Sequence, residues 1–479
     1  MASRVEASRG LGSGDPGGRG TSPSGSVGST ARRWSPGTRA GGGSRTAAGR
    51  GTYLGLDFGT SGARAIVIDD SEEVLHSEKV DYAASGLDQE EAARSTSVWE
   101  GALFSLLGNI PSGLASSLRA ICIDGTSSTS FLVDRETWSI ESRPLLYNFA
   151  AEASVVERVK AIAPEGNITC SPTSTLSKLF TWLYEDSLDV EAGNLLLLHQ
   201  ADWLSSLLLQ NPDRRGVSDY NNALKLGYDP QEKDYPQWMK SQAWRSVLPA
   251  AVVAPSTPLG VVSDKISDTF RIPRECKVAA GTTDSIAAFL AAGASEPGEA
   301  VTSLGSTLAI KVLSTKRVDN LEHGIYSHKL WGDLWLAGGA SNTGGAVIRK
   351  YFPDDQVEEL TKSMDTSAPT GLAYYPLLKA GERFPVSDAK LEPKLNPRPS
   401  EDSVFLQGIL EGIADIEKRG FELLHKEGCS TLTRVMTCGG GSKNDKWTEM
   451  RRQRLKVPVE TAAEVEAAFG SARLARRSD

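Results

Sequence analysis

Apolar and polar positions follow two different periods after residue 51, one typical of strands and one typical of helices. The clearest strand pair opens this region: Tyr53, Leu54 and Leu56 lead into Asp57, and Ala65–Ile68 returns as a second buried strand. The turn Gly59–Gly62 between them offers backbone N–H groups of the kind that bind phosphate oxygens. A carboxylate at the end of the first strand can hold Mg2+ through water. An ordinary hairpin with an exposed Asp is the alternative interpretation.

The periods of apolar and polar positions predict an alternation of strands and helices along the rest of the chain. We expect strands at 73–82, 120–124, 131–134, 278–280, 300–304, 308–312 and 434–438, and a strand from 335 that enters a glycine turn at 338–339. We expect helices at 88–109, 150–163, 173–185, 199–209, 285–292, 342–351, 403–427 and 464–475, and loops at 218–223 and 376–400.

Two stretches of this pattern begin alike, each with a hairpin around a glycine turn, first at residue 53 and again at residue 300. Such a repeat indicates an α/β chain with two related domains and a cleft between them. The breaker cluster Gly293–Gly298 is the candidate boundary. We therefore expect one domain at 51–293 and a second at 294–479.

Residues 1–50 have a composition unlike the rest of the chain. They are rich in Gly, Ser and Arg, contain only Glu6 and Asp15 as acids, and show no apolar period. A segment of this kind cannot bury enough surface to fold, so we expect disorder. Basic, Ser-rich and acid-poor segments are typical of organelle transit peptides, and we predict a plastid transit peptide and a chloroplast stroma location. A plain disordered tail or a misplaced gene start is the alternative.

Composition narrows the partners of the chain. Its 479 residues are 39% hydrophobic and 23% charged, which is typical of a soluble globular protein of two or three domains. The net charge of -8 argues against a nucleic-acid surface, and no apolar run is long enough for a bilayer. The five cysteines never stand in C-x-x-C spacing, which indicates a reduced compartment and no zinc site. We expect small-molecule partners, no nucleic acid and no membrane, and either a monomer or a homodimer.

Four motifs occur in a fixed order, at residues 57–62, 281–284, 304–307 and 439–444. Together they resemble the FGGY family of carbohydrate kinases, whose fold of two ribonuclease H-like domains is that of actin, hexokinase and the Hsp70 ATPase. The resemblance covers roughly residues 52–475. Residues 199–203, 218–225 and 281–291 look most like the plant plastid and cyanobacterial branch of D-ribulose kinases, also called xylulokinase-like.

The resemblance implies ATP and Mg2+ as cofactors and a sugar as the second substrate. It implies Asp284 as the catalytic base and Asp57 as the residue that holds the metal. The implied sugar contacts are Asp57, Ser61, Gly62, Arg64, Ser127 and Asp284. The implied nucleotide contacts are Thr60, Ser61, Gly305, Ser306, Gly440, Gly441, Asn444 and Trp447.

The chemistry of the residues agrees with this assignment. Phosphoryl transfer needs positioning and charge neutralisation more than covalent help, together with one carboxylate near the attacking hydroxyl. Asp284 stands at a predicted helix start, where the positive helix end favours the ionised carboxylate. The alternatives stay open: Asp284 as a helix cap, Ser127 as a plain turn residue and Trp447 as a core residue.

Two departures from the family pattern bear on the sugar. Many family members carry W-x-D-x-R over the sugar, whereas residues 147–152 here lack that Asp and Arg. Bacterial xylulokinases carry Met-His where this chain has Thr126 and Ser127. Both departures argue against D-xylulose. Together with Asp57 and Ser127 as the implied sugar contacts, the resemblance to the D-ribulose kinase branch then implies D-ribulose as the substrate and D-ribulose 5-phosphate as the product. D-xylulose phosphorylation, a non-catalytic sugar or nucleotide sensor, and an actin- or Hsp70-like filament ATPase are the alternatives.

Overall fold

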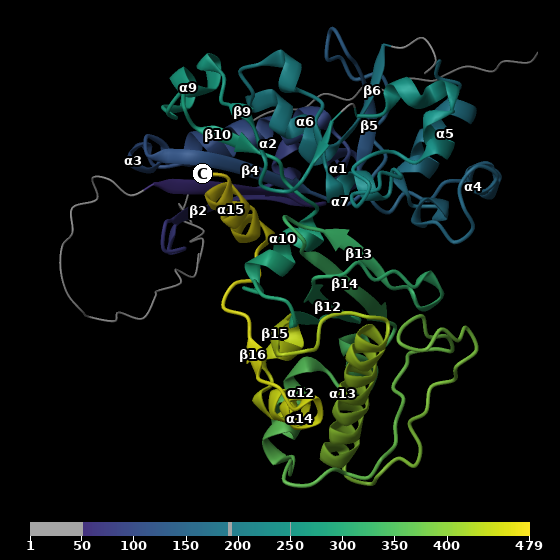
Figure 1. Ribbon diagram of the computed structural model, residues 1–479. Helices are drawn as coiled ribbons and strands as arrows, with labels where there is room; N and C mark the ends of the chain where they lie inside the picture. The colour runs from purple at the N-terminus through teal and green to yellow at the C-terminus, as the bar shows by residue number, and fades with distance from the viewer. Residues whose placement is uncertain (1–50, 190–193, 250) are drawn as a thin grey trace, which may run out of the picture. The chain divides into compact units, whose positions relative to one another are not determined.

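The computed structural model describes residues 51–189, 194–249 and 251–479. These residues form two six-stranded mixed sheets with helices packed against them (Figure 1). The predicted transit peptide at 1–50 lies outside the described residues. In the part that is described, no helix is long and apolar enough to cross a membrane.

The first sheet has the strand order β3-β2-β1-β4-β10-β9. Its strands are β1 (Thr52–Phe58), β2 (Gly62–Asp69), β3 (Val74–Asp81), β4 (Leu118–Gly125), β9 (Pro258–Val261) and β10 (Lys277–Ala279). β1, β2 and β3 are antiparallel neighbours, whereas β4 runs parallel to β1 and β10 runs parallel to β4. The predicted opening hairpin is confirmed.

The second sheet repeats this plan with the order β13-β14-β12-β11-β15-β16. Its strands are β11 (Glu299–Leu304), β12 (Leu308–Ser314), β13 (Tyr326–Lys329), β14 (Trp335–Ser341), β15 (Arg434–Cys438) and β16 (Val459–Thr461). An antiparallel hairpin, β11 and β12, again stands beside parallel strands. The expected internal repeat is therefore present. Two short pairs complete the strands: β5 (Ser130–Asp134) with β6 (Leu195–His199), and β7 (Ser218–Asp219) with β8 (Val252–Val253).

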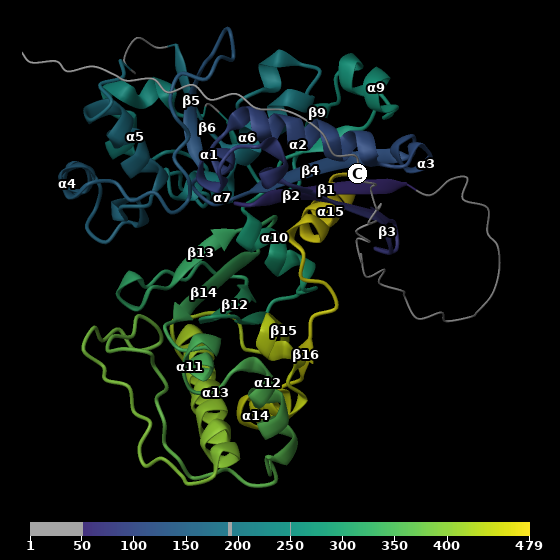
Figure 2. The same ribbon diagram turned by 180° about the vertical axis from the view of Figure 1, so that it is seen from behind.

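Helices pack against the sheets and form many of the connections between strands (Figure 2). The helices up to residue 291 are α1 (Gln89–Ala93), α2 (Thr96–Asn109), α3 (Ser112–Ala115), α4 (Ala153–Lys160), α5 (Thr175–Tyr184), α6 (Gln200–Leu208), α7 (Tyr220–Leu224), α8 (Gln237–Lys240), α9 (Asp264–Phe270) and α10 (Asp284–Ala291). Those that follow are α11 (Gly345–Tyr351), α12 (Asp354–Ser363), α13 (Asp402–Lys426), α14 (Asp445–Leu455) and α15 (Ala467–Ser478).

All residues of the central strand β1 are buried. Because successive side chains of a strand point to opposite faces of the sheet, β1 is covered on both faces. Leu54, Leu56 and Phe58 belong to the same apolar cluster as Trp99 of α2. Tyr53 points to the opposite face, into a cluster with residues of α10 and α15. The last helix of the chain, α15, therefore packs on the first sheet, against β1 and β4 (Figure 1).

Three local predictions are wrong. The helix expected at 88–109 is two helices, because Ser95 caps α2 with its side chain at Val98 N. The polar loop expected at 218–223 is β7 and the buried helix α7, whose N-cap Asp219 accepts from the backbone N–H groups of Asn221 and Asn222. Gly338 and Gly339 do not form a turn, since β14 continues through them to Ser341.

Candidate functional site

The turn between β1 and β2 presents its hydroxyl groups to solvent. Gly59 N donates to Gly62 O at 3.0 Å and closes the turn, while Thr60 and Ser61 are exposed. Gly62 is buried as the first residue of β2, and the Ser61 carbonyl accepts from Tyr82 N at 3.0 Å. The loop is thus fixed by its backbone, and its two side chains remain free to meet a phosphate.

Asp57 lies at the end of β1 in a charged cluster. Its register partners are Arg64 on β2 and Asp124 on β4. Arg64 Nη1 lies 3.2 Å from Asp57 Oδ2, and Arg64 Nε lies 3.3 Å from Glu466 Oε2. Asp57 is only 5% exposed, and burial raises its pKa above the ordinary value although Arg64 opposes this shift.

Asp124 is a second buried carboxyl group in this cluster, and the sequence analysis missed it. It is fully buried, and Ser471 Oγ of α15 donates to its Oδ2 at 2.5 Å. Its Oδ1 has no hydrogen-bond partner among the described residues. Burial and the charge of Asp57 hold the pKa of Asp124 well above its usual range.

Asp284 is the first residue of α10, and Thr283 rather than Asp284 occupies the N-cap position. Its Oδ1 accepts from Ser285 N at 2.6 Å. Burial raises the pKa of Asp284 to about 6, and Asp57 adds to the rise, while Lys311 and Lys225 oppose it. The carboxyl group is therefore mostly ionised at neutral pH but more basic than an ordinary aspartate.

Two lysines share the surroundings of Asp284. Lys311 of β12 donates from Nζ to Ser285 O at 3.4 Å, and burial lowers its pKa to about 8. Lys225 follows α7 as its C-cap, and burial lowers its pKa as well. Neither lysine was a sequence candidate, because their positions become neighbours of Asp284 only in the fold.

Ser127 lies half-buried in the turn that follows β4. Gln200 supports this turn, since its Oε1 accepts from both the backbone N and Oγ1 of Thr126 at 3.2 Å. The buried Lys178 donates from Nζ to Ser128 O at 2.6 Å. The segment 199–203 is thus a structural clamp: His199 caps α6 in a capping box with Asp202, and Gln200 then reaches the turn.

Six of the eight predicted nucleotide contacts line a single cavity of about 830 Å3. They are Gly305, Ser306, Gly440, Gly441, Asn444 and Trp447, and Thr60 and Ser61 are not among its lining residues. Further walls come from α11, α12 and α13, where the sequence shows only ordinary amphipathic helices. Size and lining fit a ligand as large as a nucleotide.

Hydrogen bonds fix the walls of this cavity. Asn444 caps α14 by accepting from Trp447 N at 2.9 Å, and its Nδ2 donates to Thr361 Oγ1 at 3.0 Å. Trp447 is 2% exposed and donates from Nε1 to Leu410 O, so it is a core residue as well as part of the wall. Arg349 Nη2 donates to Ser306 Oγ at 2.9 Å and places a cation beside the glycine turn.

The carboxyl groups near Asp57 are compatible with Mg2+. No group of three or more His, Cys, Asp and Glu side chains in the described ranges is arranged to hold a metal alone. Mg2+ is commonly held by one or two carboxylates, with water and substrate phosphates supplying the other oxygens. Burial is the main cause of the raised pKa values of Asp57 and Asp124, and a bound cation would favour their ionised forms.

Comparison with protein families gives two adjoining matches. The N-terminal domain of the FGGY family of carbohydrate kinases matches residues 52–291, and the C-terminal domain of the same family matches residues 300–478. Among curated proteins, the xylulose kinase of Lactococcus lactis is 24% identical over 429 residues, covering 84% of this chain and 82% of that protein. The L-fuculokinase of Salmonella typhi is 23% identical over 457 residues, covering 88% and 90%.

Solved structures agree on the fold. A xylulose kinase from Brucella ovis superposes with a TM-score of 0.72 at 21% identity, covering 88% of this chain and 90% of that one. A glycerol kinase from Plasmodium falciparum, solved with ADP, has a TM-score of 0.70 at 16% identity, covering 90% of both chains. The predicted α/β fold with two related domains is therefore confirmed.

Proposed function

Because the chain belongs to the FGGY family of carbohydrate kinases, we propose that it transfers the terminal phosphate of ATP to a ketopentose, D-ribulose in the first place. The observation that carries the nucleotide half of this proposal is the single cavity lined by Gly305, Ser306, Gly440, Gly441 and Asn444. Asp284 and Asp57, which influence each other's ionisation, carry the chemical half.

Asp284 is the proposed general base. Its pKa of about 6 leaves most of it ionised at neutral pH, while burial keeps it basic enough to take a proton. In the reaction it would accept the proton of the attacking sugar hydroxyl as that oxygen bonds to the terminal phosphorus of ATP, and the bond from this phosphorus to the bridging oxygen would break, so that ADP leaves. Lys311 and Lys225 stabilise the ionised form before the transfer.

Asp57 is the proposed residue for both Mg2+ and the sugar. Arg64 on β2 pairs with its carboxylate at 3.2 Å, and Asp124 is its register partner on β4. Mg2+, when bound with ATP, would neutralise phosphate charge. Thr60 and Ser61 would contact the terminal phosphate of ATP. Ser61, Gly62 and Arg64 would contact the sugar beside it.

The nucleotide would lie against the second sheet. Gly305 and Ser306 would donate to its phosphates, and Arg349 beside Ser306 would add positive charge. Gly440, Gly441 and Asn444 would border the adenosine, with Trp447 as the buried support behind them.

The choice of sugar rests on Ser127 and on the missing Met-His pair. D-ribulose and D-xylulose differ only in configuration at C3, and a site that hydrogen-bonds one hydroxyl rejects the epimer that leaves it unpaired. D-xylulose is the second candidate, favoured by the name of the Lactococcus lactis relative. The plastid branch, and with it a chloroplast location, remains part of this proposal.

The deciding experiment for the sugar measures kcat/KM for D-ribulose, D-xylulose, L-ribulose and glycerol under one condition with ATP and Mg2+. We expect D-ribulose to give the highest value. A D-xylulose value about tenfold or more above it would overturn the sugar assignment and leave the kinase assignment standing. ADP release without any sugar would indicate an ATPase, and no response to any sugar would indicate a sensor.

The base is tested with Asp284→Ala. We expect a loss of roughly a hundredfold or more in kcat, with nucleotide affinity near that of the unaltered enzyme. Asp264→Ala is the matched control, since Asp264 is also the first residue of a helix, α9. Unchanged turnover in Asp284→Ala would remove this residue from the mechanism.

A further inference from the structure

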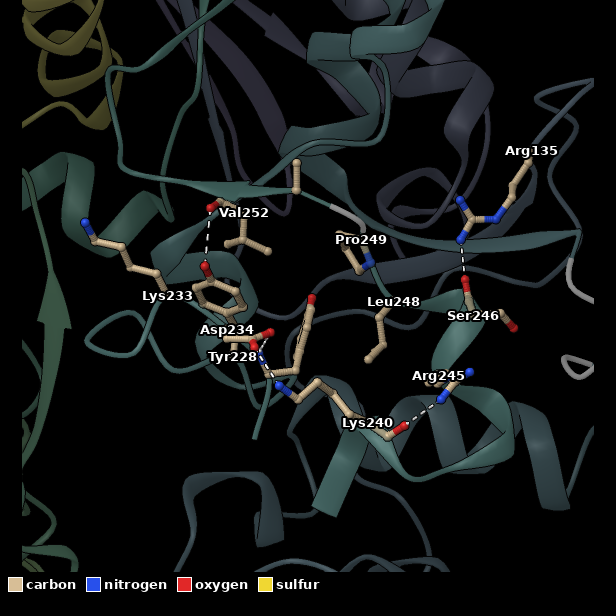
Figure 3. Close-up of a pocket in the computed structure, with 12 residues that line it drawn as sticks. Arg135, Tyr228, Lys233, Asp234, Lys240, Arg245, Ser246, Leu248, Pro249 and Val252 are labelled. Atoms are coloured by element: carbon tan, nitrogen blue, oxygen red, sulfur yellow. Dashed lines mark hydrogen bonds and ion pairs between the residues drawn. The ribbon is translucent and has the colours of Figure 1, made fainter. Parts of the chain in front are cut away.

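None of the residues assigned above to sugar or nucleotide lines a second cavity, of about 540 Å3, whose lining is drawn in Figure 3. Its walls come from three parts of the chain besides Arg135, which follows β5. They are Tyr228, Lys233, Asp234 and Tyr235 after α7, Lys240 of α8, and Arg245, Ser246, Leu248, Pro249, Ala251 and Val252 before and at the start of β8. Its volume falls within the range of small-molecule sites.

Positive charge dominates this cavity. Its lining includes four cationic side chains and one acid, Asp234, which pairs with Lys240 at 2.6 Å. Across the described residues, none of the other three, Arg135, Lys233 and Arg245, has a carboxylate within ion-pair distance. Such an excess is a local feature, because the whole chain carries a net charge of -8.

Arg135 is the most informative of these cations. It is half-buried, and within the described ranges its guanidinium donates only to backbone carbonyls, from Nε to Leu195 O at 3.1 Å and from Nη2 to Ser246 O. Burial lowers its pKa from the ordinary value. Removing a guanidinium from water without an acidic partner is costly, and a bound anion would offset that cost.

Two hydroxyl groups of the same cavity are buried without a hydrogen-bond partner in the described part of the chain. They belong to Tyr235, which is 9% exposed, and to Ser246. A buried hydroxyl left without a partner costs free energy, so both groups are available donors for a ligand. Leu248, Pro249 and Val252 add an apolar wall, on which Tyr228 is fixed by its bond to Val252 O at 3.5 Å (Figure 3).

We propose that this cavity binds a small phosphorylated metabolite, the phosphate monoester of a sugar or polyol. Arg135 and Arg245, two cations without acidic partners in the described residues, stand on the same side of the cavity in Figure 3 and match a phosphate dianion better than a single carboxylate. The unpartnered hydroxyls can donate to the remaining phosphate oxygens, and the apolar wall accommodates the carbon skeleton. The proposal concerns binding and is independent of the sugar that the enzyme phosphorylates.

Calorimetric titration of the full chain tests it, with glycerol 3-phosphate as the probe, inorganic phosphate as the head group alone and glycerol as the body alone. We expect glycerol 3-phosphate to bind with a Kd of about 1 mM or tighter, inorganic phosphate to bind more weakly and glycerol not to bind at this site. Arg135→Gln and Arg245→Gln should each weaken binding by about tenfold.

Matched variants keep the result interpretable. Arg214→Gln removes the same charge from an exposed position outside the cavity and should leave the affinity unchanged. Arg245 is exposed, so Arg245→Gln decides the question if Arg135→Gln lowers the melting temperature. Equal affinity in the Arg245→Gln and Arg214→Gln proteins, or no binding of glycerol 3-phosphate at about 10 mM, would overturn the proposal.

Discussion

The ionisation of Asp284 sets an expected pH dependence for the proposed reaction. With a pKa of about 6, the carboxylate is the proton-accepting form above that pH and is lost below it. We therefore expect kcat/KM to fall about tenfold for each pH unit on the acid side of pH 6 and to level off above it. A profile of kcat/KM from about pH 4.5 to 8 measures this fall, the acid limb of the profile.

The positive charge of Lys311 affects the pH at which the rate begins to fall, because it lowers the pKa of Asp284. Because Lys311 lowers the pKa of Asp284, Lys311→Met should move the acid limb toward neutral pH and reduce the rate at pH 6 severalfold. Lys316→Met removes a charge from an exposed position beyond the end of β12 and should leave the profile in place. A limb that does not move in Lys311→Met would show that Asp284 is not the titrating group.

At the same scale, sequence reasoning found some site residues and missed others for a physical reason. Asp57 and Asp284 follow strands and stand beside glycine or threonine turns, so a local pattern marks them. Asp124 also ends a strand, but its partner Ser471 lies 347 residues away along the chain. The pairing of β4 with β1 places Asp124 beside Asp57, and the packing of α15 on β4 supplies its hydrogen bond to Ser471.

At the scale of elements, the docking of α15 depends on two close backbone approaches. A Cβ on Gly55 of β1 would lie 1.9 Å from Ala468 O, and one on Gly470 of α15 would lie 1.8 Å from Ala287 O of α10. These contacts leave no room for a side chain. They hold α15 where Ser471 reaches Asp124 and where Glu466, just before the helix, reaches Arg64.

Gly470→Ala should therefore destabilise the fold, by several kcal/mol if the helix must shift. Gly101→Ala is the matched helical control: Gly101 of α2 is exposed with no atom within 4 Å of an added Cβ, so alanine should be neutral or stabilise by up to about 1 kcal/mol. Urea unfolding of both variants measures the difference. Equal stability would mean that α15 is not tightly docked.

Element prediction succeeded where alternation was strong and failed where polar residues were buried. β1, β2 and the long helix α13 followed directly from their apolar periods. The segment 218–223 is polar, which favours a loop, but inside the protein Asp219 accepts from the backbone N of Asn221 and from Asn222, and Asn221 Nδ2 donates to Thr282 Oγ1. Burial of these polar groups depends on tertiary partners that no local pattern reports.

At the scale of the whole molecule, the repeated sheet plan was predictable because the same hairpin pattern occurs twice in the sequence. Which helices complete each sheet was not, since α15 comes after the second sheet in the chain and packs on the first. The boundary near Gly293–Gly298 therefore remains a prediction, as do the domain limits 51–293 and 294–479.

The placement of the candidate groups along the chain leads to the last prediction. All residues that line the proposed nucleotide cavity of about 830 Å3 fall between 304 and 447, whereas Asp57 and Asp284 precede the proposed boundary. Transfer requires the terminal phosphate to meet the sugar hydroxyl beside Asp284, so we expect the two domains to close when both substrates bind. A non-hydrolysable ATP analogue with Mg2+ and D-ribulose should then reduce the radius of gyration in small-angle scattering, and the analogue alone should reduce it less. An unchanged radius with both ligands at saturation, verified by calorimetry on the same sample, would contradict closure.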